Sequence, residues 1–265
     1  MRSALSSTVR WVLLYLLALG VVIGGWGGIC ALLVWVRGRP VLPTPGETFT
    51  AAWENLPVLA QAFGTSALRF LIALVVSFLL GLPLGLAIGF ERRLDTFLSP
   101  LIYILYPMPP VALLLFLYLA FGLGEVVRLV VVVIALFFQV VVAAQGAAKY
   151  ITPSHVAAVR SAGATRLQLY RHVVLPATLP NVLTAARVSV GLGITMLYIA
   201  ETKLGVLLGP EAGLGRLIEY YTFRGDISLA GVVGLALLGL LFYALLELLE
   251  RSLCRWKFVG AQRGR

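Results

Sequence analysis

Long uncharged apolar runs alternate with short polar stretches along the whole of this 265-residue chain. About twenty apolar residues are needed to cross a bilayer as a helix. The pattern therefore predicts an all-α, polytopic membrane protein that forms one domain over residues 1–265. The six predicted transmembrane helices lie at about 11–36, 66–90, 97–121, 127–148, 178–205 and 227–249.

The overall composition agrees with a membrane protein. Hydrophobic residues make up 60% of the chain and charged residues 12%, whereas soluble domains are about half apolar and a quarter charged. The net charge of +10 is typical of basic cytoplasmic loops in multispanning proteins, so we expect no nucleic-acid partner. Cys30 and Cys254 form neither a disulfide framework nor a metal-ligand pattern.

The distribution of basic residues predicts the orientation. With six spans both termini share a side, and that side carries most of the arginines and lysines. The loops of the opposite side carry only Arg37, Arg39, Arg216 and Arg224. Because basic loops stay in the cytoplasm, both termini and the polar stretch at residues 152–176 are expected there.

Two features inside the apolar runs indicate helix packing and a break. Gly81, Gly85 and Gly89 recur every four residues, which allows another helix backbone to approach closely. Pro107, Pro109 and Pro110 interrupt the third run and remove backbone donors.

A helix broken at membrane depth is tolerated where protein or a water-filled cavity satisfies the freed groups. The prolines therefore favour a gate or pathway wall, with a plain kink as the alternative.

Ionisable side chains within spans are costly and are candidates for function. Arg69 lies near the outer end of its span, from where its head group can snorkel to the interface. Arg187 lies on the order of 15 Å into the fifth span and needs a partner or a water-filled cavity. Glu201 and Lys203 open toward the external loop. For these groups, structural pairing and solute contact are both open.

The polar stretch at residues 152–176, here called the motif segment, is predicted to form two short helices. Thr152 and Pro153 make a helix start, and Gly163 provides an end because glycine tolerates left-handed geometry. Thr165 can cap a second helix. The apolar stripe of that helix is Leu167, Tyr170 and Val174, and Pro176 is expected to close it. Such a pair fits either the lipid headgroup layer or a groove on a cytoplasmic partner.

The spacing in this segment resembles the coupling motif of bacterial ATP-binding-cassette importer permeases: E-A-A, three residues, G, nine residues, I, one residue, L-P. Residues 157–159 occupy the first triplet, Gly163 the glycine and residues 173–176 the ending. Ala157 replaces the leading glutamate, and Val173 replaces the isoleucine. Because the glutamate helps anchor the coupling helix in the family, this chain is expected to rely on Arg160 and Gly163 instead.

The resemblance extends to the nitrate/sulfonate/taurine subfamily of these permeases. The matching stretches are "LPTPGETFTAAWENL" (Leu42–Leu56), "SALRFLIALVVSFLLGLPLGLAIG" (Ser66–Gly89) and "PMPPVALLLFLYLAFGLGE" (Pro107–Glu125). They occur in the same order and register as in the subfamily. A departure is the link at residues 206–211, which is longer than usual and is expected to remodel the external mouth or the contact with the binding protein.

The resemblance implies a type I importer permease of MetI-like fold in the cell inner membrane. Its implied partners are two ATP-binding-cassette ATPase subunits, a second permease copy (a homodimer rather than a paralogue pair), an external solute-binding protein and the lipid bilayer. The implied solute is a small anion such as a sulfonate, nitrate or bicarbonate, or a vitamin-precursor heterocycle. The residues expected to couple to the ATPase are Ala157, Ala158, Arg160, Gly163, Ala164, Leu167, Leu175 and Pro176.

The chain is not expected to be an enzyme. It contains no G-x-x-x-x-G-K-[ST] phosphate loop, so ATP and Mg are expected on the partner ATPase, with no cofactor or metal here. Its two histidines, His155 and His172, have no nucleophile partner or metal-ligand spacing. The alternative function is a self-contained secondary transporter or channel, which would usually show intramembrane acidic residues or inverted repeats.

Overall fold

The computed structural model describes residues 2–122, 124–203 and 212–257, and these residues are helical almost throughout. The α-helices are α1 (Arg2–Arg37), α2 (Pro45–Glu54), α3 (Leu56–Phe90), α4 (Arg92–Leu105), α5 (Leu114–Phe121), α6 (Glu125–Lys149), α7 (Pro153–Ser161), α8 (Arg166–Leu169), α9 (Leu175–Lys203), α10 (Leu214–Tyr220) and α11 (Gly225–Leu253). A 3-10 turn (Pro110–Leu113) precedes α5, and a π-helical turn (Tyr170–Val174) joins α8 to α9.

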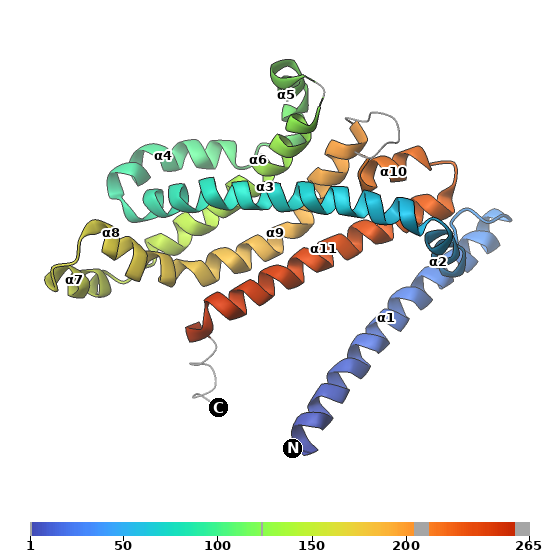
Figure 1. The fold of residues 1–265 in the computed structure, drawn as a ribbon, viewed down its shortest axis with the longest axis horizontal. Helices are drawn as coiled ribbons and strands as arrows, with labels where there is room; N and C mark the ends of the chain where they lie inside the picture. The colour runs from blue at the N-terminus through green and yellow to red at the C-terminus, as the bar shows by residue number, and fades with distance from the viewer. Residues whose placement is uncertain (1, 123, 204–211, 258–265) are drawn as a thin grey trace.

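The body of the molecule is formed by the long helices α3, α6, α9 and α11 (Figure 1). α6 packs between α3 and α9, and α9 packs in turn against α11. Fully buried side chains such as Phe70, Leu136, Leu197 and Leu238 fill the space between them. The helices α7 and α8 lie at one end of this bundle, which we call the motif end, while α2 and α10 lie at the opposite end.

The three regularly spaced glycines of α3 face α6 and explain how closely these helices pack. A Cβ atom on Gly85 would lie 2.5 Å from the Val141 carbonyl oxygen, and one on Gly89 would lie 2.3 Å from the Gln145 carbonyl oxygen. Both distances are shorter than any normal contact. The predicted close approach of a second helix is therefore confirmed, and α6 is that helix.

Within the part of the chain that the structure describes, five helical segments are long and apolar enough to cross a membrane. A sixth is obtained if α4 and the Pro110–Phe121 segment count as one span bent by 85°. α3 begins at Leu56, ten residues before the predicted span, because the mostly apolar stretch at residues 56–65 continues the helix.

The end predicted at Pro176 is wrong, because a single helical segment runs from Arg166 to Thr202. A proline ring clashes with the carbonyl group one turn earlier in a regular α-helix. Here the wider π-helical turn at Tyr170–Val174 lies just before Pro176 and makes room for the ring.

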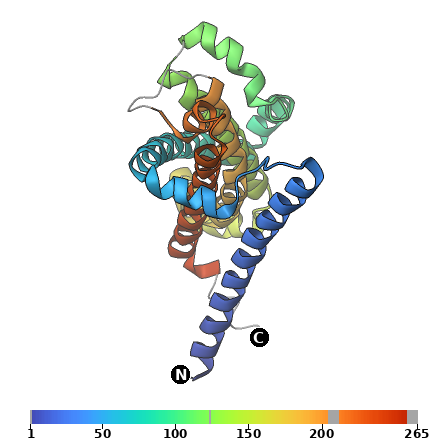
Figure 2. The ribbon, with the colours of Figure 1, turned by 90° about the vertical axis from the view of Figure 1, so that its right-hand side faces the viewer.

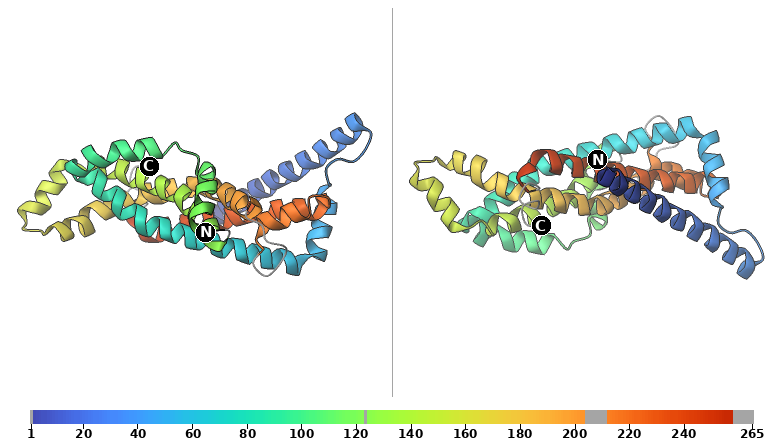
Figure 3. Two further views of the ribbon diagram at one scale, coloured as in Figure 1. Left: turned by 90° about the horizontal axis from the view of Figure 1, so that it is seen from above. Right: turned by 90° about the horizontal axis from the view of Figure 1, so that it is seen from below.

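The first helix leaves the bundle at a wide angle (Figures 2 and 3). Two side chains of α1 form hydrogen bonds to one carbonyl group in the segment between α1 and α2. The Trp26 indole N–H donates to the Pro43 carbonyl oxygen at 3.0 Å, and the Cys30 thiol lies 3.5 Å from the same oxygen. Most of the large apolar side chains of α1 are exposed, as expected of a helix that lies in lipid.

Candidate functional site

The motif segment contains the sharp corner that its sequence predicts. Gly163 has φ of +81°, in the left-handed region, and directly follows the residue that ends α7. A Cβ atom on Gly163 would meet nothing within 4 Å. The glycine is therefore required by the backbone conformation and not by crowding.

The second helix of the segment is capped as predicted. The Gln168 backbone N–H donates to the Thr165 hydroxyl oxygen at 3.3 Å, and the Gln168 side-chain oxygen accepts from the Thr165 backbone N–H at 2.8 Å. This reciprocal capping box satisfies two donors at the start of the helix. The corner and the cap together fix the path of the chain between α7 and α9.

The predicted apolar stripe is wrong at one position. Leu167 is 78% exposed, whereas Leu169 is 1% exposed and packs into the bundle with Val174. The reason is that α8 is a single turn followed by a π-helical turn, so a spacing of 3.6 residues does not hold across it. The other predicted coupling residues divide in the same way: Ala157, Ala158, Arg160 and Gly163 are exposed, and Ala164, Leu175 and Pro176 are partly buried.

A hollow of about 630 Å³ lies between α7 and the adjoining ends of α3 and α6. Its lining includes Glu91, Lys149, Ala157 and Arg160. The hollow therefore combines groups of both charges at the motif end of the bundle.

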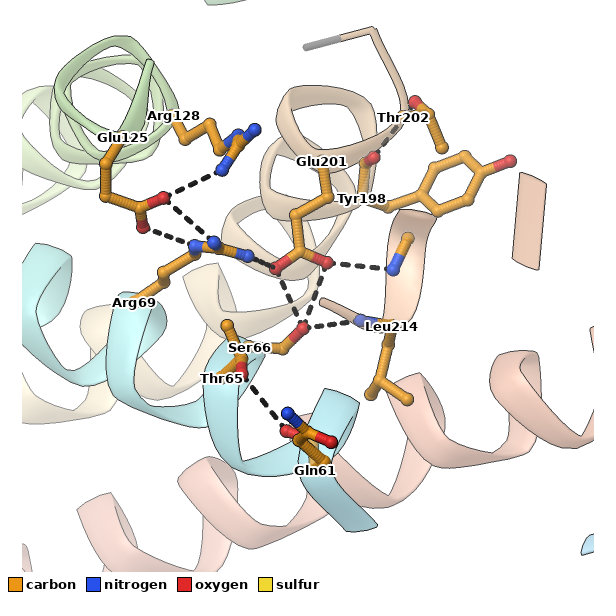
Figure 4. Close-up of polar contacts among 11 residues, drawn as sticks. Gln61, Thr65, Ser66, Arg69, Glu125, Arg128, Tyr198, Glu201, Thr202 and Leu214 are labelled. Atoms are coloured by element: carbon orange, nitrogen blue, oxygen red, sulfur yellow. Dashed lines mark hydrogen bonds and ion pairs between the residues drawn. The ribbon is translucent and has the colours of Figure 1, made fainter. Parts of the chain in front are cut away.

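At the opposite end, Arg69 holds two carboxylates (Figure 4). Its Nη1 atom lies 2.9 Å from Glu201 Oε1, and its Nη2 atom lies 2.8 Å from Glu125 Oε2. Arg128 also donates to Glu125, at 2.8 Å. Arg69 is only 4% exposed, so the prediction that it snorkels to the interface is wrong: the two carboxylates draw it into the bundle.

The Glu201 carboxylate connects three helices. Its oxygens lie 2.8 and 2.9 Å from the Ser66 hydroxyl on α3, and one of them accepts the Gly215 backbone N–H of α10 at 2.8 Å. The Ser66 oxygen in turn accepts the Leu214 backbone N–H at 2.8 Å. A Cβ atom on Gly213 would lie 2.0 Å from a Glu201 oxygen, so the chain passes this carboxylate without space for a side chain.

We call Ser66, Arg69, Glu125, Arg128 and Glu201 the Arg69 cluster. The Glu201 side chain is fully buried and its carboxylate is bound from several sides. Of the two roles left open by the sequence, this geometry favours structural pairing over solute contact. The Lys203 side chain and the 206–211 link lie outside the described residues.

Arg187 has the partner that its depth in the span requires. Its Nη2 atom lies 2.9 Å from Glu250 Oε2 on α11, and its guanidinium carbon lies 5.2 Å from the centre of the Tyr243 ring. Glu250 also binds Thr184 at 3.1 Å and Lys257 at 2.6 Å. Arg187 lines an apolar groove of about 690 Å³ between α9 and α11.

The three prolines of the third apolar run lie at the bend between α4 and α5. Pro107 and Pro109 are exposed, and Pro110 begins the 3-10 turn. The bend of 85° is larger than a plain kink, because the two helical pieces run almost at right angles. This geometry is compatible with the predicted gate or pathway wall.

Several residues of these clusters were not singled out from the sequence. Glu125 begins α6 and Arg128 lies in its first turn, Glu250 lies in the last turn of α11, and Glu91 lies between α3 and α4. Each lies at or near the end of an apolar run, where a charged residue costs little free energy and does not interrupt the hydropathy pattern. A search for acidic residues at span ends that could reach Arg69 or Arg187 would have suggested Glu125 and Glu250.

Taken together, the apolar helical bundle, its internal ion pairs and the exposed, glycine-cornered segment are typical of a polytopic membrane protein. Residues 77–255 match the family model described as "Binding-protein-dependent transport system inner membrane component", and the chain belongs to this family.

The names of similar proteins agree with this family. The chain is 32% identical to the taurine transport system permease protein TauC of Escherichia coli (strain K12) over 200 residues, which cover 75% of this chain and 71% of that one. It is 28% identical to the putative aliphatic sulfonates transport permease protein SsuC of Bacillus subtilis (strain 168) over 248 residues, 91% of this chain and 84% of that one.

A solved structure confirms the fold. The chain superimposes on a chain from an inward-facing crystal form of the MetNI methionine ABC transporter with a TM-score of 0.62 and 20% identity. The match covers 76% of this chain and 98% of that one. The predicted importer-permease fold is confirmed, and the chain is the inner-membrane permease component of an ABC importer.

Proposed function

We propose that this chain forms the solute pathway of an ATP-driven importer for small anions, with sulfonates as the first candidates, and that the motif segment couples it to a separate ATPase. The solute class rests on relatives named for taurine and aliphatic sulfonates. Nitrate-like and bicarbonate-like anions and vitamin-precursor heterocycles are the other solutes within the subfamily. ATP and Mg bind to the ATPase.

The observation that carries the coupling role is the exposure of the motif segment. α7 buries none of its residues, and Leu167 of α8 projects from the molecule. An exposed leucine between arginines, on a backbone fixed by a glycine corner and a cap, suits a groove on a protein partner. The same residues on a mobile backbone would suit a lipid surface equally well.

The proposed complex contains two ATPase subunits, two copies of this chain and an external solute-binding protein. Both termini and the motif segment face the cytoplasm in this arrangement. The basic residues of the sequence support this orientation.

Gly163→Leu tests the coupling role. Because leucine disfavours the left-handed conformation, the variant should redirect α7 and uncouple ATP hydrolysis from transport. The matched control is Gly38→Leu, which replaces another glycine of positive φ with no neighbour within 4 Å, but lies at the end of α1.

The measurement is a mild-detergent pull-down of the wild-type chain and both variants, followed by taurine uptake and ATP hydrolysis in proteoliposomes. We expect a stoichiometric ATPase with the wild-type chain and Gly38→Leu, and loss of the ATPase or of coupled uptake in Gly163→Leu. A wild-type chain that elutes alone and transports without ATP would instead be a self-contained transporter. Coupled uptake by Gly163→Leu would contradict the role of the motif segment.

A further inference from the structure

A single residue, Glu91, forms the corner between α3 and α4. Its backbone is extended, with φ of −100° and ψ of 109°, and both neighbouring residues are helical. One of its carboxylate oxygens lies 2.7 Å from Arg166 Nη2 and accepts the Tyr170 hydroxyl at 3.2 Å. The Tyr170 ring also packs edge-on against Phe90, with 5.3 Å between ring centres. The corner therefore contacts the motif segment through both a charge and a ring.

This corner is a side-chain contact of the motif segment with the bundle, in addition to the chain itself, which continues from α8 into α9. α7 buries no residue, whereas Leu169 and Val174, on either side of Tyr170, are buried. Among the residues that the structure describes, the pair of Glu91 and Arg166 is the one ion pair that joins the motif segment to the bundle. A force applied to α7 or α8 thus reaches the bundle at Glu91 and the apolar contacts beside it, as well as along the helix that continues into α9.

The helix that starts at this corner is also held by α6. Asp95, in the first turn of α4, lies 2.6 Å from Lys149 Nζ at the end of α6 and binds the Ser99 hydroxyl. Gln145 of α6 donates to the Ser99 oxygen at 2.6 Å. The first turns of α4 are therefore placed by side chains of α6 and by the motif segment, and not by the chain connection alone.

The far end of α4 is the bend at the prolines. α4 ends at Leu105, and the chain then turns through 85° before Pro110 begins the next helical segment. α4 is continuous from Arg92 to Leu105, with Pro100 inside it, and links a displacement at Glu91 to the bend.

We propose that Glu91 is the positioning residue through which the motif segment moves α4 and the bend at residues 106–109. The inference rests on the proposed function, since the movement would come from the ATPase bound to the motif segment. It adds to that function the route by which the movement enters the bundle.

The experiment uses the complete complex with its ATPase, in a chain whose Cys30 and Cys254 are replaced by alanine. Met108, at the bend and 41% exposed, is replaced by cysteine, and its rate of reaction with a thiol reagent is measured with and without Mg-ATP. The variants are Glu91→Gln and the reversed pair Glu91→Arg with Arg166→Glu. The matched control is Asp226→Asn, which breaks the 2.9 Å ion pair with Arg224 at the opposite end of the bundle.

We expect Glu91→Gln to retain the ATPase while the Mg-ATP-dependent change in labelling rate falls roughly two- to fivefold, the range of a partly exposed ion pair. The reversed pair should restore most of the change, and Asp226→Asn should leave it intact. Tyr170→Phe keeps the ring on Phe90 and removes only the hydroxyl donor, so it should give a smaller loss in a folded chain.

An unchanged labelling response in Glu91→Gln with the ATPase bound would overturn the inference. So would a reversed pair as defective as Glu91→Gln, because a charge interaction must tolerate exchange of its partners. If the wild-type complex contains no ATPase, the proposed function itself fails and the inference fails with it, an outcome distinguished by the composition of the purified complex.

Discussion

Replacing Gly85 by alanine should force α3 and α6 apart. The added Cβ atom would lie 2.5 Å from the Val141 carbonyl oxygen and 2.7 Å from the Ala144 Cβ atom. Neither of these two atoms can move away unless the α6 backbone moves with it. Restoring ordinary contacts near 3.5 Å requires the two backbones to separate by about 1 Å locally.

The size of the effect follows from two opposing contributions. Overpacking of this kind costs about 1–3 kcal/mol, and alanine gains about 1 kcal/mol over glycine in a helix interior. Gly64 lies in the same helix, and a Cβ atom there would meet nothing within 4 Å. Gly64→Ala should therefore gain helix stability without the overpacking cost. The two variants should therefore differ by about 1–3 kcal/mol in the free energy of unfolding.

Thermal unfolding of the detergent-purified chain measures this difference. For a chain of this size each kcal/mol shifts the midpoint by about 2–4 °C, so Gly64→Ala should melt at least a few degrees above Gly85→Ala. Equal midpoints would show that the helices separate at no cost, and the reasoning from close packing would be refuted.

The remaining predictions concern the Arg69 cluster and the start of α2. Arg69→Leu leaves the Glu201 carboxylate buried without its cation and should lower the free energy of unfolding by about 3–5 kcal/mol. Arg69→Lys keeps a positive charge and should lose less stability than Arg69→Leu. An Arg69→Leu variant as stable as the wild-type chain would contradict the role of the ion pair. Hydrogen bonds from the Thr44 backbone N–H and hydroxyl hold the pKa of Glu47 below its ordinary value, so Thr44→Ala should raise that pKa part of the way back in an NMR titration. Because the folded pKa is lowered, the stabilisation is present above the ordinary carboxyl pKa and is lost as the pH falls through the lowered one. An unchanged pKa would contradict a contribution of the hydroxyl and assign the lowering to the Thr44 backbone N–H, which alanine retains.

The parts of the fold that depend on local sequence were predictable. The apolar runs, the glycine corner at Gly163 and the cap at Thr165 follow from residues within a few positions of one another. The glycine spacing in α3 likewise predicts a close neighbour, although it does not say which helix that neighbour is.

The pairings between distant residues could not be predicted. Arg69 and Glu201 are 132 positions apart, and nothing in either local sequence selects the other. The same limit explains the error at Leu167, since one π-helical turn changes which side chains face the bundle. Such a turn is set by packing at Leu169 and Val174, which depends on the positions of α3 and α6.

The contact between α3 and α6 also restricts how the protein can change shape. α6 begins at Glu125, paired with Arg69 of α3, and ends at Lys149, paired with Asp95 just beyond α3. Sliding one helix past the other by a turn, about 5.4 Å, would break both ion pairs. The pairs at the two ends of α6 therefore disfavour shear between α3 and α6. Rotations at hinges outside this pair leave these contacts intact, so we expect α3 and α6 to keep their relative position while such hinges turn.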